Sequence, residues 1–296
     1  MNTAACIVVR RPDLERLLAT IRSIAPQVHE VVVVVDAGSD MLAVARVLRG
    51  IAAVVPVPRG TGAGAAANRG MRLLVDRGAE AVVRLDQHDV APDGLVEDLV
   101  RLFEDPRVGI AVGVLGPVGA VRVPAGAAGL VPRDVDACAT SGTVVRADVW
   151  QQIGGWDEEL AADHLEYDLC LRVRQSGSVV VQDPAVVIAR PVPTPAADDA
   201  LALADCAHDS VWFARKHRGV PVSVRVAGRS VPATYGAIVA RAVRIAVDGR
   251  VHDRSGRVGA LLRGALAGAA VRRHPQPTGV LAAAADRRRV RSDSAA

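Results

Sequence analysis

Three carboxylates stand close together near the middle of the chain, and they are the residues best placed to do chemistry. Asp163, Glu166 and Asp168 follow a loop at residues 153–158 that holds two glycines, a tryptophan and two acidic residues. Apolar residues with helical spacing come after Asp163, which predicts a helix that begins there. Carboxylates on the first turn of a helix can line a pocket, and one of them can take a proton from an incoming hydroxyl group.

A second polar group follows a run of valines at residues 31–35, which is typical of a buried parallel strand. Asp36 ends this run, and Gly38 and Ser39 follow it. The carboxylate of Asp36 can accept the imide N–H of a pyrimidine base. The alternative is that it serves only the turn, because Asp before Gly is ordinary turn chemistry.

A third group closes the predicted strand at residues 80–85. Asp86, His88 and Asp89 together can hold a divalent ion that neutralises a diphosphate. An imidazole among carboxylates favours manganese over magnesium. The alternative is an acidic surface turn.

A glycine-rich stretch at residues 59–70 leads into a predicted helix. Its small residues, among them Gly64, let the backbone approach a ligand, and Asn68 can bond to that ligand. It does not fit the dinucleotide fingerprint, because it does not follow the first predicted strand, and it lacks the Gly-Lys-Ser/Thr of a phosphate loop. The alternative is a helix that packs tightly on a sheet.

Strands and helices are predicted to alternate, which indicates an α/β fold with a doubly wound sheet. The predicted strands are residues 4–9, 31–35, 52–57, 80–85, 108–114, 140–145 and 178–181. Ligands of such sheets bind at the carboxyl ends of the strands, where Asp36 and Asp86 fall. We expect one domain at 1–218, a basic amphipathic helical extension at 219–273 and a disordered tail at 274–296.

Charge is unevenly distributed along the 296 residues. From residue 211 onward there are 17 basic and 4 acidic residues, a net +13, whereas the rest has 19 basic and 28 acidic residues, a net −9. The basic part suits an anionic membrane surface, or it is simply a solvated helical face. It lacks the interleaved aromatic residues typical of single-strand binding, so we expect no nucleic acid partner.

The location predicted from the sequence is the cytoplasm. The sequence has no signal peptide and no uninterrupted apolar run long enough to span a bilayer. Its four cysteines match no zinc spacing, which is typical of a reduced cytosolic protein.

In this order, the motifs resemble those of glycosyltransferase family 2, which has a GT-A fold. The resemblance covers residues 4 to about 218 and is greatest to bacterial rhamnosyltransferase-like members. It implies a mixed sheet flanked by helices and an inverting transfer of a sugar from a dTDP- or UDP-sugar, with rhamnose as the leading candidate. The acceptor would be a hydroxyl of a cell-envelope or lipid-linked glycan, reached at the inner face of the membrane.

The resemblance also assigns roles to individual residues. Glu166 aligns with the catalytic base, and Asp168 is the reserve candidate. The implied donor-binding residues are Asp36, Gly38, Ser39, Gly64, Asn68 and Asp86. The implied acceptor side comprises Gly155, Trp156, Asp157 and Asp163, with Trp156 either stacking on a sugar or anchoring the loop in the core. The implied ligands of Mn²⁺ or Mg²⁺ are Asp86, His88 and Asp89.

Several positions depart from the family pattern. The usual polar motif after the first strand is absent, Gly60 replaces an Asn, and Ala189 falls where a metal-binding His is common. The site is then either a weaker metal site, or one in which His88, Asp89 or Arg190 compensates, with arginine as the diphosphate clamp. A degenerate member that binds a nucleotide or a partner without catalysis is the main alternative. A sugar nucleotidyltransferase is a weaker one, because residues 10–13 form no phosphate loop.

Overall fold

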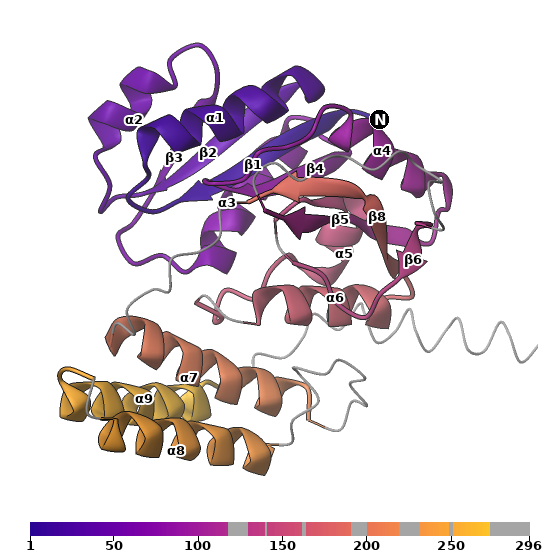
Figure 1. Ribbon diagram of the computed structural model, residues 1–296. Coiled ribbons are helices and arrows are strands. Elements are labelled where there is room, and N and C mark those ends of the chain that lie inside the picture. Colours follow the sequence, from indigo (N-terminus) through magenta and orange to yellow (C-terminus); the bar gives the residue numbers. More distant parts are fainter. Residues whose placement is uncertain are drawn as a thin grey trace, which may run out of the picture.

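The computed structural model describes residues 1–117, 130–139, 141–161, 164–190, 200–218, 231–248 and 251–272. Its centre is an eight-stranded sheet with the order β3-β2-β1-β4-β7-β5-β8-β6, flanked by helices (Figure 1). The strands are β1 (Thr3–Val9), β2 (Glu30–Asp36), β3 (Ala53–Val57), β4 (Ala81–Asp86), β5 (Val108–Gly116), β6 (Arg133–Asp134), β7 (Thr143–Arg146) and β8 (Val179–Ala189). The predicted α/β class with a mixed sheet is confirmed.

The valine run becomes an interior strand because both of its faces are covered. Strand β2 pairs in parallel with β1 and β3, and every residue from Val31 to Asp36 is buried. Side chains alternate across a strand. Val32 and Val34 therefore pack into one core layer, whereas Val31, Val33 and Val35 pack into the other.

Helices cover both faces of the sheet. One core layer contains apolar residues of α1 (Leu14–Ile24), α2 (Met41–Val47) and α4 (Leu95–Arg101). The other contains residues of α3 (Ala63–Asp76), α5 (Ala147–Ile153) and α6 (Leu165–Gln175). Helix α6 begins two residues after the start expected from the sequence, and it carries Glu166 and Asp168 on its first turn.

Strand direction brings the predicted site residues to one edge of the sheet. Strands β1, β2 and β4 are parallel to one another, so Asp36 and Asp86 end at the same edge. Strand β7 lies antiparallel between β4 and β5, and β8 is parallel to β5. The start of β7, with Ser141 just before it, and the end of β8, with Arg190 just after it, therefore meet that edge as well.

Three helices form the C-terminal unit: α7 (Ala200–Lys216), α8 (Val231–Val247) and α9 (Arg254–Ala270). They share an apolar cluster that includes Leu203, Ile238 and Leu261. Helix α7 lies between the other two helices and the sheet domain (Figure 1), and its Trp212 packs into the core beside α6. The helix before the expected boundary at residue 218 thus packs with the helices after it. The predicted tail at 274–296 lies outside the described residues.

No helix in the described part of the chain is long and apolar enough to cross a membrane.

Helix α9 packs directly on the backbone of α7 through glycines. A Cβ atom at Gly264 would overlap the carbonyl oxygen of Ala204. We expect Gly264→Ala to lower the free energy of unfolding by about 1–3 kcal/mol, because overpacking forces the two helices apart. Urea denaturation followed by circular dichroism measures the change.

Gly259→Ala is the matched control in the same helix. A Cβ atom there meets only the flexible end of Arg263, so the substitution should be neutral or stabilising through helix propensity. Equal effects of the two substitutions would contradict the packing of α9 on α7.

Candidate functional site

A cavity of about 310 Å³ opens at the carboxyl ends of β1, β2 and β4. Its lining comprises Val8, Val9, Arg10, Asp36, Val57, Thr61, Ala63, Ala66, Arg84, Asp86, Gln87, His88 and Ala161. The structure therefore brings together residues of two groups predicted separately from the sequence: Asp36 from one, and Asp86 and His88 from the other. A cavity at the ends of parallel strands is the usual ligand position in such a sheet.

Asp36 is ionised and fixed in place at one end of this cavity. Its carboxylate accepts hydrogen bonds from the backbone N–H groups of Gly38 at 2.7 Å and Gly60 at 2.9 Å. Burial raises the pKa of Asp36, but these two hydrogen bonds and the charges of Arg10 and Arg59 bring it below its usual value. An ionised carboxylate is an acceptor only, which suits an N–H donor on a ligand.

Ser39 and Gly38 have supporting roles in this turn. Ser39 Oγ accepts a hydrogen bond from the backbone N–H of Arg11 at 2.9 Å, which holds the loop after β1 against the loop after β2. A Cβ atom at Gly38 would lie 2.8 Å from Asp36 Oδ1. Both residues shape the turn around Asp36.

Three buried polar atoms of the same cavity have no hydrogen-bond partner among the residues that the structure describes. They are Arg84 Nε, Gln87 Oε1 and His88 Nδ1, and all three residues line the cavity. Buried polar groups are nearly always paired, so a cluster of unpaired ones points to a missing ligand or water. Sequence reasoning missed Arg84 because it lies inside an otherwise apolar strand.

A second cavity, of about 430 Å³, lies beside the first. Its lining comprises Asp86, Ala137, Cys138, Ala139, Ser141, Glu166, Tyr167, Gln182 and Arg190. Asp86 lines both cavities, and Glu166 faces the second one from the first turn of α6. Glu166, the predicted base, and Asp86, the predicted carboxylate on the diphosphate side, therefore line the same cavity.

Arg190 binds both acidic residues of the predicted metal site. Its Nη2 lies 2.6 Å from Asp86 Oδ2 and 3.0 Å from Asp89 Oδ2, and its Nε lies 2.7 Å from Asp89 Oδ1. Asp89 is fully buried, and it also accepts hydrogen bonds from the backbone N–H of Asp86 and from Ser141 Oγ. His88 lines the first cavity instead of joining these carboxylates.

This arrangement does not fit a divalent cation. Among the described residues, no group of three or more His, Cys, Asp or Glu side chains is placed to hold a metal. The carboxylate oxygens that would bind the ion are taken by a guanidinium. The predicted set of Asp86, His88 and Asp89 is therefore divided between a buried ion pair and the donor-side cavity.

The glycine-rich stretch packs the core and does not face a ligand. Asn68 is buried, and its amide group bonds to the backbone N–H and carbonyl of Trp156 and to Glu158. A Cβ atom at Gly64 would lie 2.7 Å from the carbonyl oxygen of Asp157. The donor-binding roles predicted for Gly64 and Asn68 are corrected: both hold the loop at 153–158 against α3.

The loop at 153–158 is also a structural element. Trp156 is 3% exposed and packs in the core, so it anchors the loop and does not stack on a sugar. Asp157 accepts hydrogen bonds from Trp212 Nε1 and Lys216 Nζ. Gly155 has φ +77°, and a Cβ atom there would overlap Asn68 Oδ1. Direct acceptor contacts predicted for these residues are corrected. The predicted Asp163 lies outside the described residues.

Asp168 is a core ion and cannot serve as the reserve base. It is fully buried, with Arg172 Nη2 2.6 Å, Lys216 Nζ 2.6 Å and His217 Nε2 2.8 Å from its oxygens. Burial raises the pKa of Asp168, but the charges of Arg172 and Lys216 and the hydrogen bond from His217 hold it well below the usual range. Arg172 thus pairs with a carboxylate in the core.

Sequence reasoning missed two contacts between distant parts of the chain. Lys216 and His217 reach Asp168 from the end of α7, and no local pattern connects them. Cys138 and Cys170 are far apart in the sequence, but their Sγ atoms lie 3.4 Å apart beside Glu166's cavity. The hydrogen bond between the two thiols and burial raise the pKa of Cys138, so it is a thiol and not a nucleophilic thiolate.

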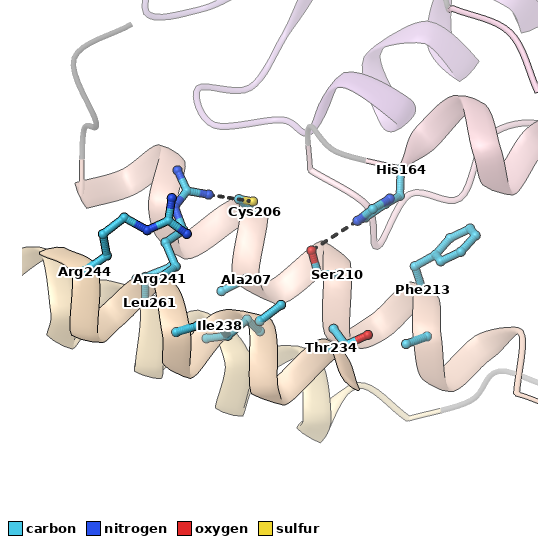
Figure 2. Close-up of a pocket in the computed structure, with 13 residues that line it drawn as sticks. His164, Cys206, Ala207, Ser210, Phe213, Thr234, Ile238, Arg241, Arg244 and Leu261 are labelled. Carbon is cyan, nitrogen blue, oxygen red and sulfur yellow. Dashed lines mark hydrogen bonds between the residues drawn. The ribbon is translucent and has the colours of Figure 1, made fainter. Parts of the chain in front are cut away.

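A third cavity, of about 580 Å³, lies between α7 and α8 (Figure 2). Its lining is mostly apolar, with Arg241 and Arg244 on one side and His164 on the other. His164 Nε2 lies 3.1 Å from Ser210 Oγ, and Arg241 Nη1 lies 3.4 Å from Cys206 Sγ. The cavity includes none of the strand-end carboxylates, so it is separate from the two cavities at the sheet edge.

Comparison with known families agrees with this site. Residues 6–128 match the family model "Glycosyl transferase family 2", and this range includes Asp36, Asp86 and Asp89. No curated protein matches the sequence. The family match supports a glycosyltransferase and leaves the rhamnosyltransferase-like subgroup untested.

Several solved structures have a similar fold. One, described as GalNAc-T7 with UDP, GalNAc and Mn²⁺, is 13% identical with a TM-score of 0.58 and covers 82% of this chain. S. aureus TarS is 13% identical with a TM-score of 0.55 over 84% of this chain. A mannosyltransferase from Pyrobaculum calidifontis in complex with GDP-Man and Mn²⁺ is 16% identical, with a TM-score of 0.56, over 91% of this chain and 87% of its own.

The fold is therefore that of the GT-A glycosyltransferases, with a central mixed sheet flanked by helices. The chain spans 57% of the GalNAc-T7 structure and 44% of the TarS structure. At these identities the likeness defines the fold alone.

The buried charge of Asp168 predicts a large stability effect. Asp168→Asn leaves Arg172 and Lys216 without their shared carboxylate, and breaking such a buried pair costs about 3–5 kcal/mol. An unfolded Asp has a pKa of about 3.9. Because the folded value is lower, this contribution is complete above about pH 4 and is lost as the pH falls further. Urea denaturation of both proteins should show their difference shrinking below pH 4.

Asp105→Asn is the control, because Asp105 pairs with the neighbouring Arg107 at the surface. It should change stability little at any pH. An Asp168→Asn protein as stable as the parent would contradict the buried network.

Proposed function

We propose that this protein is an inverting glycosyltransferase that moves a sugar from a nucleoside diphosphate sugar to a hydroxyl acceptor. One observation carries the proposal: Asp86 forms the common wall of two cavities, one with Asp36 and the other with Glu166. The first has the size and the unpaired polar groups for a nucleotide. The second places a carboxylate on the opposite side of Asp86, where an acceptor can enter.

The reaction needs one base and one leaving group. Glu166 takes the proton of the acceptor hydroxyl while its oxygen attacks the anomeric carbon of the sugar. The bond between that carbon and the diphosphate oxygen breaks, and the diphosphate leaves with the electron pair. Because the base and the diphosphate lie on opposite sides of the sugar, its configuration inverts.

The donor is a dTDP- or UDP-sugar in this proposal. The ionised Asp36 is an acceptor for the imide N–H that both bases carry. The segment 163–172 resembles rhamnosyltransferase-like proteins, so dTDP-rhamnose is the first donor to test. The acceptor is a glycan of the cell envelope or one linked to a lipid.

Glu166→Gln should reduce transfer by about 10²- to 10⁴-fold, the usual contribution of a positioned base. Nucleotide affinity should remain unchanged, because Glu166 lines the acceptor-side cavity and not the donor-side one. Donors are first screened by thermal shift. The rate of transfer is then measured as the release of nucleoside diphosphate, and the affinity for nucleotide is measured by calorimetry.

Glu97→Gln is the control, since Glu97 is an exposed residue of α4 that pairs only with arginine. Full activity of Glu166→Gln would contradict the assignment of the base. Nucleotide binding by the parent protein without any transfer would instead favour the degenerate, non-catalytic alternative.

The C-terminal unit supports a peripheral position at the inner face of the membrane. Helix α8 exposes Val239, Val243 and Val247 at helical spacing, with Val247 73% exposed. Helix α9 exposes Leu262 and Leu266. Residues 231–272 contain seven Arg and two Asp, so these apolar residues lie in a strongly basic part of the chain. Exposed apolar residues together with arginines are typical of interfacial helices that bind anionic lipid.

The double substitution Val243→Glu with Leu266→Glu should weaken binding to vesicles that contain phosphatidylglycerol, and added salt should weaken the parent's binding. Vesicle flotation measures both effects. Leu42→Glu is the control, because Leu42 is an exposed apolar residue of α2 in the sheet domain. Equal flotation of the double variant and the parent would contradict the proposed membrane face.

A further inference from the structure

We propose that Arg190 takes the place of the divalent cation, so that the protein binds the donor diphosphate with a fixed guanidinium and without a metal ion. This inference rests on the proposed function and concerns the same site. Three observations carry it: the guanidinium bridges Asp86 and Asp89, the charges there are already balanced, and Nη1 of the guanidinium has no hydrogen bond within the described residues.

The backbone around Arg190 is held from both sides. Ala189 and Val90 exchange two backbone hydrogen bonds, of 2.9 and 3.1 Å, and the N–H of Arg190 donates to the carbonyl of Gly116 at 2.8 Å. The side chain is then fixed by Asp86 and Asp89, two residues of the turn after β4. The guanidinium is therefore preorganised at the sheet edge where both cavities meet.

The local charges leave no net attraction for a divalent ion. Asp86 and Asp89 carry two negative charges, and Arg190 and the buried Arg84 carry two positive charges. A metal ion would have to displace Arg190 from both carboxylates and leave the guanidinium unpaired. Asp89 is fully buried, so its pairing with Arg190 is costly to break.

The guanidinium retains donors for a ligand. Nε and Nη2 bond to the carboxylates, whereas Nη1 has no hydrogen bond to any residue in the described part of the chain. Arg190 lines the acceptor-side cavity together with Asp86, whose other side lines the donor-side cavity. A diphosphate that crosses from one cavity to the other passes Arg190, whose Nη1 has two N–H groups to donate to phosphate oxygens.

Calorimetry on the full chain tests the inference, with dTDP, UDP and GDP as ligands in EDTA and in Mn²⁺. We expect the parent protein to bind its preferred nucleotide with the same affinity, within about threefold, in both conditions. Arg190→Ala should lose about 10- to 100-fold in EDTA, the range for a charge-assisted hydrogen bond. It should recover in Mn²⁺, because Asp86 and Asp89 are then free to bind the ion.

Two further variants separate the effect of charge from that of hydrogen-bond geometry and provide a control. Arg190→Lys keeps the positive charge and loses the paired donors, so it should bind more weakly than the parent but better than Arg190→Ala. Arg174→Ala is the matched control, because Arg174 also pairs with two carboxylates, Asp134 and Asp136, but lines neither cavity. It should bind nucleotide as the parent does.

The comparison of EDTA with Mn²⁺ uses the parent protein, so it holds even if Arg190→Ala does not fold. A tenfold or greater gain in affinity with Mn²⁺, or Mn²⁺ immobilised by the parent with nucleotide in electron paramagnetic resonance, would overturn the inference and leave the proposed function standing. No nucleotide binding in either condition would overturn both.

Discussion

The buried carboxylate of Asp168 is the interaction on which the rest of the site depends. It joins Arg172 of α6 with Lys216, the last residue of α7, and with His217, which follows it. Arg172 in turn donates to the carbonyls of Ile153 and Gly155. A buried charge is tolerated only when it is fully paired, so these elements are held in one arrangement. Glu166 lies two residues before Asp168 on the same helix, and its direction is set by this network.

The same network explains why most of the conspicuous motif residues do not face a ligand. Asn68 of α3 and Arg172 of α6 both hydrogen-bond to the loop at 153–158, and Trp156 of this loop packs in the core. Close approach is possible because Gly64 and Gly155 lack side chains. The loop and α3 therefore form a support for α6. A motif shared by a family can be retained for such support as well as for contact with substrate.

Much of the fold could be predicted from local patterns in the sequence. The roles of the site residues could be predicted only in part. The valine run before Asp36 and the strand before Asp86 are unambiguous, and parallel pairing alone brings both residues to one edge. The burial of Asp168 and Asn68 was not predicted, because it depends on partners 49 and 88 residues away. Arg190 was named from the sequence only as one of the residues that could compensate for Ala189 at the metal position. Its pairing with Asp89 required the sheet order, which places the end of β8 beside the turn after β4.

A fixed guanidinium and an exchangeable ion place different demands on the site. An ion can be lost with the product, and its supply controls affinity for the nucleotide. Arg190 is part of the chain and already bonded to Asp86 and Asp89, so it adds attraction for the diphosphate only through donors that these carboxylates leave over. The negative charge beside it also limits how tightly a diphosphate product is held. In the proposed reaction, the carboxylates that position the guanidinium would thus favour release of the nucleoside diphosphate after transfer.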